Sequence, residues 1–74
     1  MSQINFAIIG AGNIGKILAE AIGNVPEART TVVCNRTEGP GRALADQYGA
    51  DWEADYNAVV TRDDVDVVAV CTPS

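Results

Sequence analysis

Residues 4–15 read Ile-Asn-Phe-Ala-Ile-Ile-Gly-Ala-Gly-Asn-Ile-Gly, and this stretch decides the fold. Its first half, residues 4–9, is a short and mostly apolar run that is typical of a strand buried in a sheet. Its second half places Gly10, Gly12 and Gly15 in the spacing G-x-G-x-x-G. This spacing predicts a dinucleotide site when it follows a strand and opens a helix, as it does here.

Each glycine has a physical role in this pattern. Gly10 allows a sharp turn off the strand, and Gly12 has no side chain to keep a pyrophosphate away from its backbone. Gly15 allows the helix to pack close to the strand. The free backbone N–H groups of Asn13 and Ile14, together with the helix dipole, are expected to face the phosphates.

A helix is predicted directly after the glycines, because apolar residues recur there every three or four positions. Gly23, Asn24 and Pro26 are expected to end this helix. The residues predicted to form its core-facing side are Ile14, Ile17, Leu18, Ala21, Ile22 and Val25.

Three more strands and two more helices are predicted farther along the chain. The strands are residues 30–34, a weak one at 50–52, and the apolar run 65–71. One helix has Pro40 near its first turn, and a short one is capped by Asp55. This alternation predicts a parallel sheet between helices, and right-handed crossovers give the strand order 3-2-1-4. The predicted fold is a three-layer α/β Rossmann-type fold, β-α-β-α-β-α-β.

The length of 74 residues leaves room for one small unit. A dinucleotide-binding domain with a substrate domain is several times longer. We therefore expect residues 1–74 to be the N-terminal part of an NAD(P)-binding domain, a truncated half-domain without the substrate domain that a small-molecule substrate requires. The sheet edge left open by truncation is expected to favour self-association.

The charge balance excludes several classes of partner. Ten acidic and five basic residues give a net charge of −5, which is unfavourable for binding nucleic acid or an anionic membrane surface. No apolar run approaches the ~20 residues that span a bilayer. The N-terminus lacks the pattern of a signal peptide, so a cytoplasmic location is expected.

The two cysteines, Cys34 and Cys71, are predicted to be free thiols, and the chain has no histidine. The cysteines end strands that are separated by a third strand, which predicts a spacing of ~10 Å between their Cα atoms. A disulfide requires less than about 7 Å. Without histidine, the chain has no convincing zinc-ligand set and no base for a Ser-His-Asp or Cys-His arrangement.

The end of the second strand bears on the choice of cofactor. NAD-binding domains carry Asp or Glu about 20 residues after the glycines, where the carboxylate binds the ribose 2′-hydroxyl. This chain has neutral Asn35 there, followed by Arg36 and Thr37, which can bind a 2′-phosphate. The sequence thus favours NADP. NAD remains the alternative, since Glu38 could serve the ribose if the loop bends differently.

Other conspicuous residues have ordinary structural interpretations. Trp52 and Tyr56 are expected to pack against the protein, with adenine stacking as the alternative role, and Tyr48 is expected to be a core residue. Asp63, Asp64 and Asp66 are expected to form a solvated turn rather than a cation site.

Over essentially its whole length the chain resembles the N-terminal part of the Gfo/Idh/MocA family of oxidoreductases, which includes glucose–fructose oxidoreductase and inositol dehydrogenase. The last two matching segments are more specific than the glycines. The matching segments are residues 8–15, 34–36, 42–45, 48–50, 55–56, 64–68 and 71–73.

The resemblance implies hydride transfer between NADP(H) and a carbonyl or hydroxyl carbon of a sugar or polyol. It also implies that Thr72 and Pro73, just after Cys71, lie against the cofactor near its nicotinamide half. Many family members have Asp where this chain has Asn35; the Asn-Arg-Thr triplet is similar to that of NADP-using shikimate and 6-phosphogluconate dehydrogenases. The family's catalytic lysine lies beyond Ser74, so no catalytic residue is assigned.

Two alternatives stay open from the sequence. One is a non-catalytic nucleotide-binding module, since the lysine and the second domain are missing from the 74 residues. The other is a different Rossmann reductase, related to dihydrodipicolinate reductase or homoserine dehydrogenase.

Overall fold

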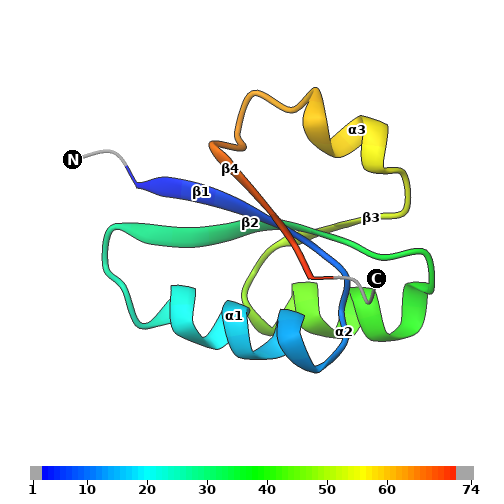
Figure 1. Ribbon diagram of the computed structural model, residues 1–74, viewed down its shortest axis with the longest axis horizontal. Coiled ribbons are helices and arrows are strands. Elements are labelled where there is room, and N and C mark those ends of the chain that lie inside the picture. Colours follow the sequence, from blue (N-terminus) through cyan, green and yellow to red (C-terminus); the bar gives the residue numbers. More distant parts are fainter. Residues whose placement is uncertain (1–2, 72–74) are drawn as a thin grey trace.

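The computed structural model describes residues 3–71 and shows strands and helices in strict alternation along the chain (Figure 1). The elements are β1 (Ile4–Ile9), α1 (Asn13–Gly23), β2 (Ala28–Cys34), α2 (Glu38–Gln47), β3 (Asp51–Glu53), α3 (Tyr56–Val60) and β4 (Val67–Val70).

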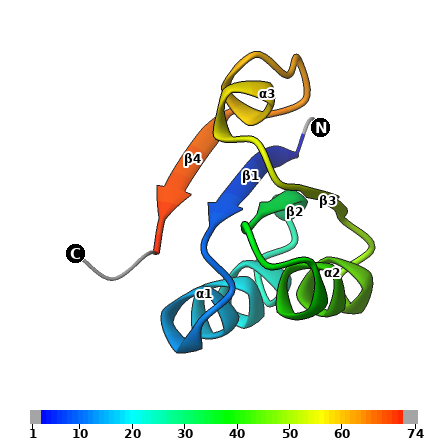
Figure 2. The ribbon, with the colours of Figure 1, turned by 90° about the vertical axis from the view of Figure 1, so that its right-hand side faces the viewer.

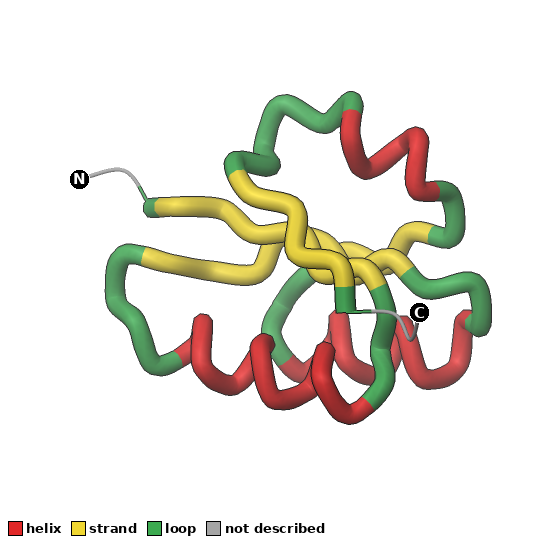
Figure 3. Tube along the Cα trace, in the orientation of Figure 1, coloured by secondary structure: helices red, strands yellow, loops and turns green. Residues whose placement is uncertain are grey.

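The strands form one parallel sheet in the order β3-β2-β1-β4. Helices α1 and α2 cover one face of the sheet and α3 lies on the other, as two perpendicular views show (Figures 1 and 2). The same three layers are visible when the trace is coloured by secondary structure (Figure 3). The predicted fold class and strand order are therefore confirmed. The two central strands, β1 and β2, have a neighbour on each side.

The core lies on both faces of these central strands. Neighbouring residues of β1, Ala7 and Ile8, point to opposite faces, and both are fully buried. Val32 and Val33 of β2 repeat this arrangement. Apolar residues in succession, instead of alternation with polar ones, are the pattern of a parallel strand covered on both sides.

The prediction of the core-facing side of α1 was largely wrong. Ile22 is buried as predicted and Leu18 is half-buried, but the remaining buried positions of this helix are Gly15 and Ala19. Apolar and small residues cover more than half of the helix circumference, opposite Lys16 and Glu20, so their spacing does not select which part of that surface faces the sheet. Small residues face the sheet because the helix begins very close to β1. The exposed members of the predicted side are Ile14, Ile17, Ala21 and Val25.

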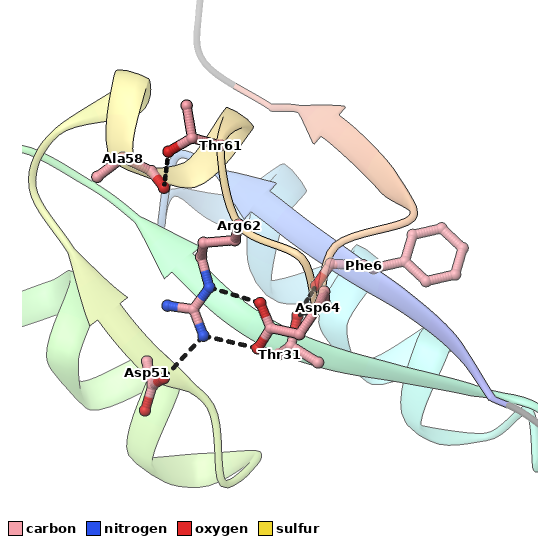
Figure 4. A network of polar contacts seen from close by, with 7 residues as sticks. All are labelled: Phe6, Thr31, Asp51, Ala58, Thr61, Arg62 and Asp64. Carbon is pink, nitrogen blue, oxygen red and sulfur yellow. Dashed lines mark hydrogen bonds and ion pairs between the residues drawn. The ribbon is translucent and has the colours of Figure 1, made fainter.

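Polar contacts at the edge where the strands begin, here called the amino edge, fix β3 and β4 to the centre of the sheet (Figure 4). Arg62 donates two hydrogen bonds to Asp64, each 2.7 Å long, and a third of 2.9 Å to Asp51 at the start of β3. Asp66 accepts a 2.8 Å hydrogen bond from the backbone N–H of Asn5. The sequence predicted that Asp64 and Asp66 belong to a solvated turn. In the structure, both carboxylates also accept hydrogen bonds from other residues of the chain.

A β-bulge connects the same edge to β1. The register between β1 and β2 shifts after Phe6, which leaves Thr31 as an extra residue of β2. The Thr31 hydroxyl lies 3.3 Å from the carbonyl oxygen of Phe6 and 3.1 Å from that of Asp64 (Figure 4). The Thr31 hydroxyl is therefore within hydrogen-bonding distance of both carbonyl oxygens at the bulge.

Candidate functional site

A cavity of about 810 Å³ opens at the opposite edge of the sheet, where the strands end. We call this the carboxyl edge. The chain leaves β1 toward β2 on one side, while β4 pairs with β1 on the other, so the cavity lies at the point where the strand order reverses. This is the position at which open α/β sheets bind ligands. The residues that line it are Ile9, Gly10, Cys34, Asn35, Arg36, Ala54, Asp55, Tyr56 and Val70.

The glycine-rich turn from β1 into α1 is shaped by two close constraints. Gly10 has a φ of 103°, which residues with a side chain rarely adopt, and its N–H donates a 2.7 Å hydrogen bond to the carbonyl of Cys34. A Cβ atom on Gly15 would collide with the carbonyl oxygen of Gly10. By contrast, among residues 3–71 a Cβ atom on Gly12 would meet no atom within 4 Å beyond its chain neighbours, so the space above Gly12 is open to a ligand.

The first turn of α1 presents free hydrogen-bond donors beside this open space. The first N–H groups of a helix have no acceptor within the helix, and Gly12 has no side chain to cap them. Asn13 and Ile14 are both exposed, and the first turn carries no acidic residue. The positive end of the helix dipole is therefore available to an anion, and the open position at Gly12 fits a pyrophosphate.

At the end of β2, the side chain of Asn35 is bonded to both of the neighbouring loops. The backbone N–H of Ala11 donates to Oδ1 of Asn35 at 3.3 Å, and Nδ2 of Asn35 donates to the carbonyl of Thr37 at 2.9 Å. The loop that follows β2 is thus joined to the glycine-rich turn. The side chain of Asn35 therefore makes hydrogen bonds within the protein. It also carries no negative charge, unlike the Asp or Glu that is common at this position in NAD-binding domains.

The residues after Asn35 differ in how they are engaged. Arg36 lines the cavity, is exposed, and has no ion-pair partner among residues 3–71. Thr37 is the N-cap residue of α2, but its side chain makes no capping hydrogen bond. Glu38 pairs with Arg42, one helical turn later, at 2.8 Å. The basic residue therefore faces the cavity, while the acidic residue is held on the helix and is not among the lining residues.

The two cysteines are free thiols, as predicted. Burial raises the pKa of the Cys34 thiol, and the nearby carboxylates of Glu53 and Asp55 raise it further, so this thiol is neutral at physiological pH. Cys71 is half-buried, and its N–H donates to the carbonyl of Ile9 at 2.8 Å. Thr72 and Pro73, which the family resemblance placed near the nicotinamide, lie outside the described residues.

The three aromatic residues have different environments. Tyr48 and Trp52 pack against the core, as predicted. The indole N–H of Trp52 donates to the carbonyl of Asn35 at 3.0 Å, and the Arg42 guanidinium lies 5.1 Å from the ring centre. The packing prediction is wrong for Tyr56, which is 49% exposed and lines the cavity.

Three lining residues that the sequence analysis did not assign to the site follow β3. They are Ala54, Asp55 and Tyr56. The signal for them was their place directly after a predicted strand, because the segments after parallel strands surround the ligand site. The Asp55 carboxylate caps α3, accepting a 2.9 Å hydrogen bond from the N–H of Asn57.

Comparison with known proteins agrees with the fold and the glycine-rich turn. A family model described as an oxidoreductase family with an NAD-binding Rossmann fold, GFO_IDH_MocA, matches residues 4–74. Inositol 2-dehydrogenase from Rhizobium meliloti is 32% identical over 71 residues, which are 96% of this chain and 21% of that protein.

Solved structures are similar over the same region. GenD2 from gentamicin A biosynthesis, in complex with NAD, gives a TM-score of 0.95 at 28% identity and covers all of this chain. A mutant of KijD10, a 3-ketoreductase from Actinomadura kijaniata in complex with TDP-benzene and NADP, gives 0.86 at 27% identity over 97% of the chain. The chain spans about one fifth of the length of these relatives, 21% and 23% respectively. Within residues 3–71, no helix has the length and apolar character needed to cross a membrane.

Proposed function

Because this chain belongs to the GFO_IDH_MocA oxidoreductase family with an NAD-binding Rossmann fold, we propose that it binds NADP(H) for hydride transfer to or from a sugar- or polyol-like substrate. The names of an inositol 2-dehydrogenase and a 3-ketoreductase among its relatives support this chemistry. The nicotinamide supplies the hydride chemistry, and this chain's residues bind and orient the dinucleotide.

The proposed binding mode follows the geometry of the carboxyl edge. The pyrophosphate lies over Gly12 and receives hydrogen bonds from the first N–H groups of α1, at Asn13 and Ile14. Gly10 and Gly15 shape the turn without contributing side chains. The resemblance to the family supports placing the nicotinamide half beyond the end of β4, at Cys71, Thr72 and Pro73.

The adenosine half lies at the end of β2, where one observation supports NADP over NAD. Arg36 faces the cavity without an ion-pair partner among the described residues, whereas Glu38 is paired with Arg42. A 2′-phosphate supplies the partner that Arg36 lacks, and the Thr37 hydroxyl can add a hydrogen bond. A ribose 2′-hydroxyl would meet no carboxylate at Asn35.

Calorimetric titration of the chain with NADPH and with NADH tests this proposal. NADPH is expected to bind more tightly. Arg36→Ala is expected to weaken NADPH binding by roughly 10- to 100-fold, the effect of one hydrogen-bonded charge, and to leave NADH binding within about twofold. The matched control is Arg29→Ala, which removes an exposed arginine of β2 that does not line the cavity. Tighter binding of NADH would overturn the choice of NADP and direct attention to Glu38.

We assign no catalytic residue in this chain. The chain spans 21% of the length of the inositol 2-dehydrogenase that it matches, and we propose that the proton-transferring residue and the substrate contacts of the parent enzyme lie in the part that it does not span. We therefore expect the chain alone to bind NADPH without oxidising it in the presence of a sugar or keto-sugar. Steady loss of NADPH absorbance in such a mixture would contradict this assignment.

A further inference from the structure

Asn35 lines the cavity and connects the two loops that the proposed function assigns to different phosphates. Its Oδ1 accepts the N–H of Ala11 in the glycine-rich turn, and its Nδ2 donates to the carbonyl of Thr37 at the start of α2. We refer to these two hydrogen bonds as the Asn35 bridge. We propose that the Asn35 bridge is a positioning device that couples the pyrophosphate turn to the Arg36–Thr37 loop, so that the two ends of the site act together. This inference rests on the proposed function.

The backbone of Asn35 is fixed independently of the bridge. Its N–H donates to the carbonyl of Glu53 at 3.1 Å, and its carbonyl accepts the indole N–H of Trp52 at 3.0 Å. Both bonds come from β3. The main chain at Asn35 therefore cannot shift without breaking contacts with the neighbouring strand, and the side-chain amide projects from a fixed base.

Helix α2 closes on Asn35 from the other side. A Cβ atom on Gly41 would lie 2.8 Å from the Cβ atom of Asn35 and 2.6 Å from Nε1 of Trp52, closer than real Cβ atoms come. The first turn of α2 thus touches both residues through a glycine. Because β3 and α2 hold Asn35 between them, its amide reaches Ala11 and Thr37 from a single, well-defined position.

The amide of Asn35 makes both bonds of the bridge, which an ionised carboxylate cannot do. Asparagine has one acceptor group and one donor group, whereas an ionised aspartate has acceptors alone. Aspartate at position 35 would keep the bond from Ala11 and place a negative charge against the carbonyl of Thr37. Alanine would lose both bonds without adding a charge. Comparing these two substitutions therefore separates the effect of a negative charge at position 35 from the effect of losing both hydrogen bonds.

The coupling follows from the position of Arg36 between two tethered residues. Asn35 is held to β3, and Thr37 is held to Asn35, so the backbone of Arg36 has little freedom. A backbone that is fixed before the ligand arrives leaves only the Arg36 side chain to be ordered, so less conformational entropy is lost on binding. A ligand that orders the glycine-rich turn at Ala11 also strengthens the bond to Asn35, and thus the loop that carries Arg36.

The first test needs no ligand. Amide hydrogen exchange, followed by NMR on the free chain, is measured for wild type, Asn35→Ala and Asn35→Asp. The Ala11 amide is expected to exchange at least about tenfold faster in Asn35→Ala and at the wild-type rate in Asn35→Asp, since only the latter keeps the acceptor. Asn24→Ala, at an exposed asparagine after α1, is the matched control. Unchanged exchange of Ala11 in Asn35→Ala would overturn the bridge.

The second test measures the coupling as a double-mutant cycle with NADPH, combining Asn35→Ala and Arg36→Ala. Removing Arg36 is expected to weaken NADPH binding by about tenfold or more in the wild-type background, and by less than about threefold when Asn35 is already alanine. Equal effects in both backgrounds would overturn the coupling and leave Asn35 as a structural residue only.

The two tests keep this inference distinct from the proposed function. If wild type binds neither dinucleotide, the proposed function fails, and the coupling inference that rests on it fails as well, whereas the exchange of Ala11 still decides whether the bridge exists. If circular dichroism shows that Asn35→Ala does not fold, Asn35→Asp replaces it. The Gly41 amide, which donates to the same Thr37 carbonyl, is then expected to exchange faster while Ala11 keeps its protection. Wild-type exchange at both amides would overturn the bridge.

Discussion

At the amino edge of the sheet, Arg62 is bonded to two carboxylates, whereas at the carboxyl edge Arg36 faces the cavity with no such partner among residues 3–71. The two arginines look alike in the sequence, since each stands in a loop next to polar residues. They differ in whether their guanidinium groups already have ion-pair partners in the described part of the chain. Arg62 is three-quarters buried between Asp51 and Asp64, with 25% of its side chain exposed.

The comparison extends to the backbone at the two edges. At the amino edge, the N–H of Asn5 is bonded to Asp66 and the carbonyl of Phe6 to Thr31. At the carboxyl edge, the first N–H groups of α1 remain open beside Gly12. Polar groups bonded within the chain stabilise the fold, and exposed polar groups without a partner are those that can bind a ligand. The predictions below test this division of roles.

The largest effect is expected from changing the shape of the glycine-rich turn. Gly15→Ala places a Cβ atom on the carbonyl oxygen of Gly10 and is expected to lower the free energy of unfolding by about 1–3 kcal/mol. Gly12→Ala meets no atom of the described part of the chain within 4 Å, and is expected to lower the free energy of unfolding by less than about 1 kcal/mol while weakening NADPH binding by about tenfold or more. Urea unfolding and calorimetry measure the two effects. Equal stability of the two variants would contradict the close contact at Gly15.

A smaller effect is expected at the amino edge. Arg62→Ala removes the donor for two carboxylates and is expected to lower the free energy of unfolding by about 1 kcal/mol, the scale of a partly exposed ion-pair network. It should leave NADPH affinity within about twofold, the reverse of Arg36→Ala. Arg29→Ala, which changes the net charge equally, controls for long-range electrostatics. Loss of NADPH binding in Arg62→Ala without loss of stability would break the comparison between the edges.

The smallest effect is a pH dependence at the same edge. Hydrogen bonds from Arg62 lower the pKa of Asp64 in the folded chain, so the stabilisation is fully present above the unfolded value of about 3.9. It is lost as the pH falls through the lowered folded value. Because Asp64 is nearly half exposed, Asp64→Asn should cost less than about 1 kcal/mol at neutral pH. Urea unfolding of both proteins from pH 7 to pH 3 should show this difference shrinking in acid; a constant difference would exclude the ionised pair as its cause.

Much of the fold could be predicted because its determinants are local. The strand at residues 4–9, the glycine spacing and the cap at Asp55 are each specified by adjacent residues, and right-handed crossovers then fix the strand order. The buried side of α1 could not be predicted, because Ile14 and Ile17 are as apolar as Ile22. The close approach of Gly15 to the end of β1 was predicted from the glycine spacing, but the side of the helix that faces the sheet was not.

The candidate site, too, has features that could be predicted from the sequence and features that could not. Glycine positions and the neutral residue at the end of β2 are visible in the sequence, since their spacing from β1 is nearly constant in this fold. The bonds of Asn35 to Ala11 and Thr37 depend on the path of two loops, and no pattern of residue types indicates them. The same holds for Tyr56, whose exposure depends on how α3 lies over the sheet.

The pairing of β4 with β1 has a consequence for the order of events during synthesis. Asn5 and Asp66, which are bonded at the start of these strands, lie 61 residues apart. At about 5–20 residues per second, Asp66 is made roughly 3–12 seconds after Asn5, longer than a small β-α-β unit needs to form. The unit from β1 to β2 can therefore assemble while one side of β1 has no partner strand. We expect the β1 amides that face β4 to gain protection from hydrogen exchange last. Nascent chains should therefore be most prone to aggregation in the seconds before β4 is synthesised.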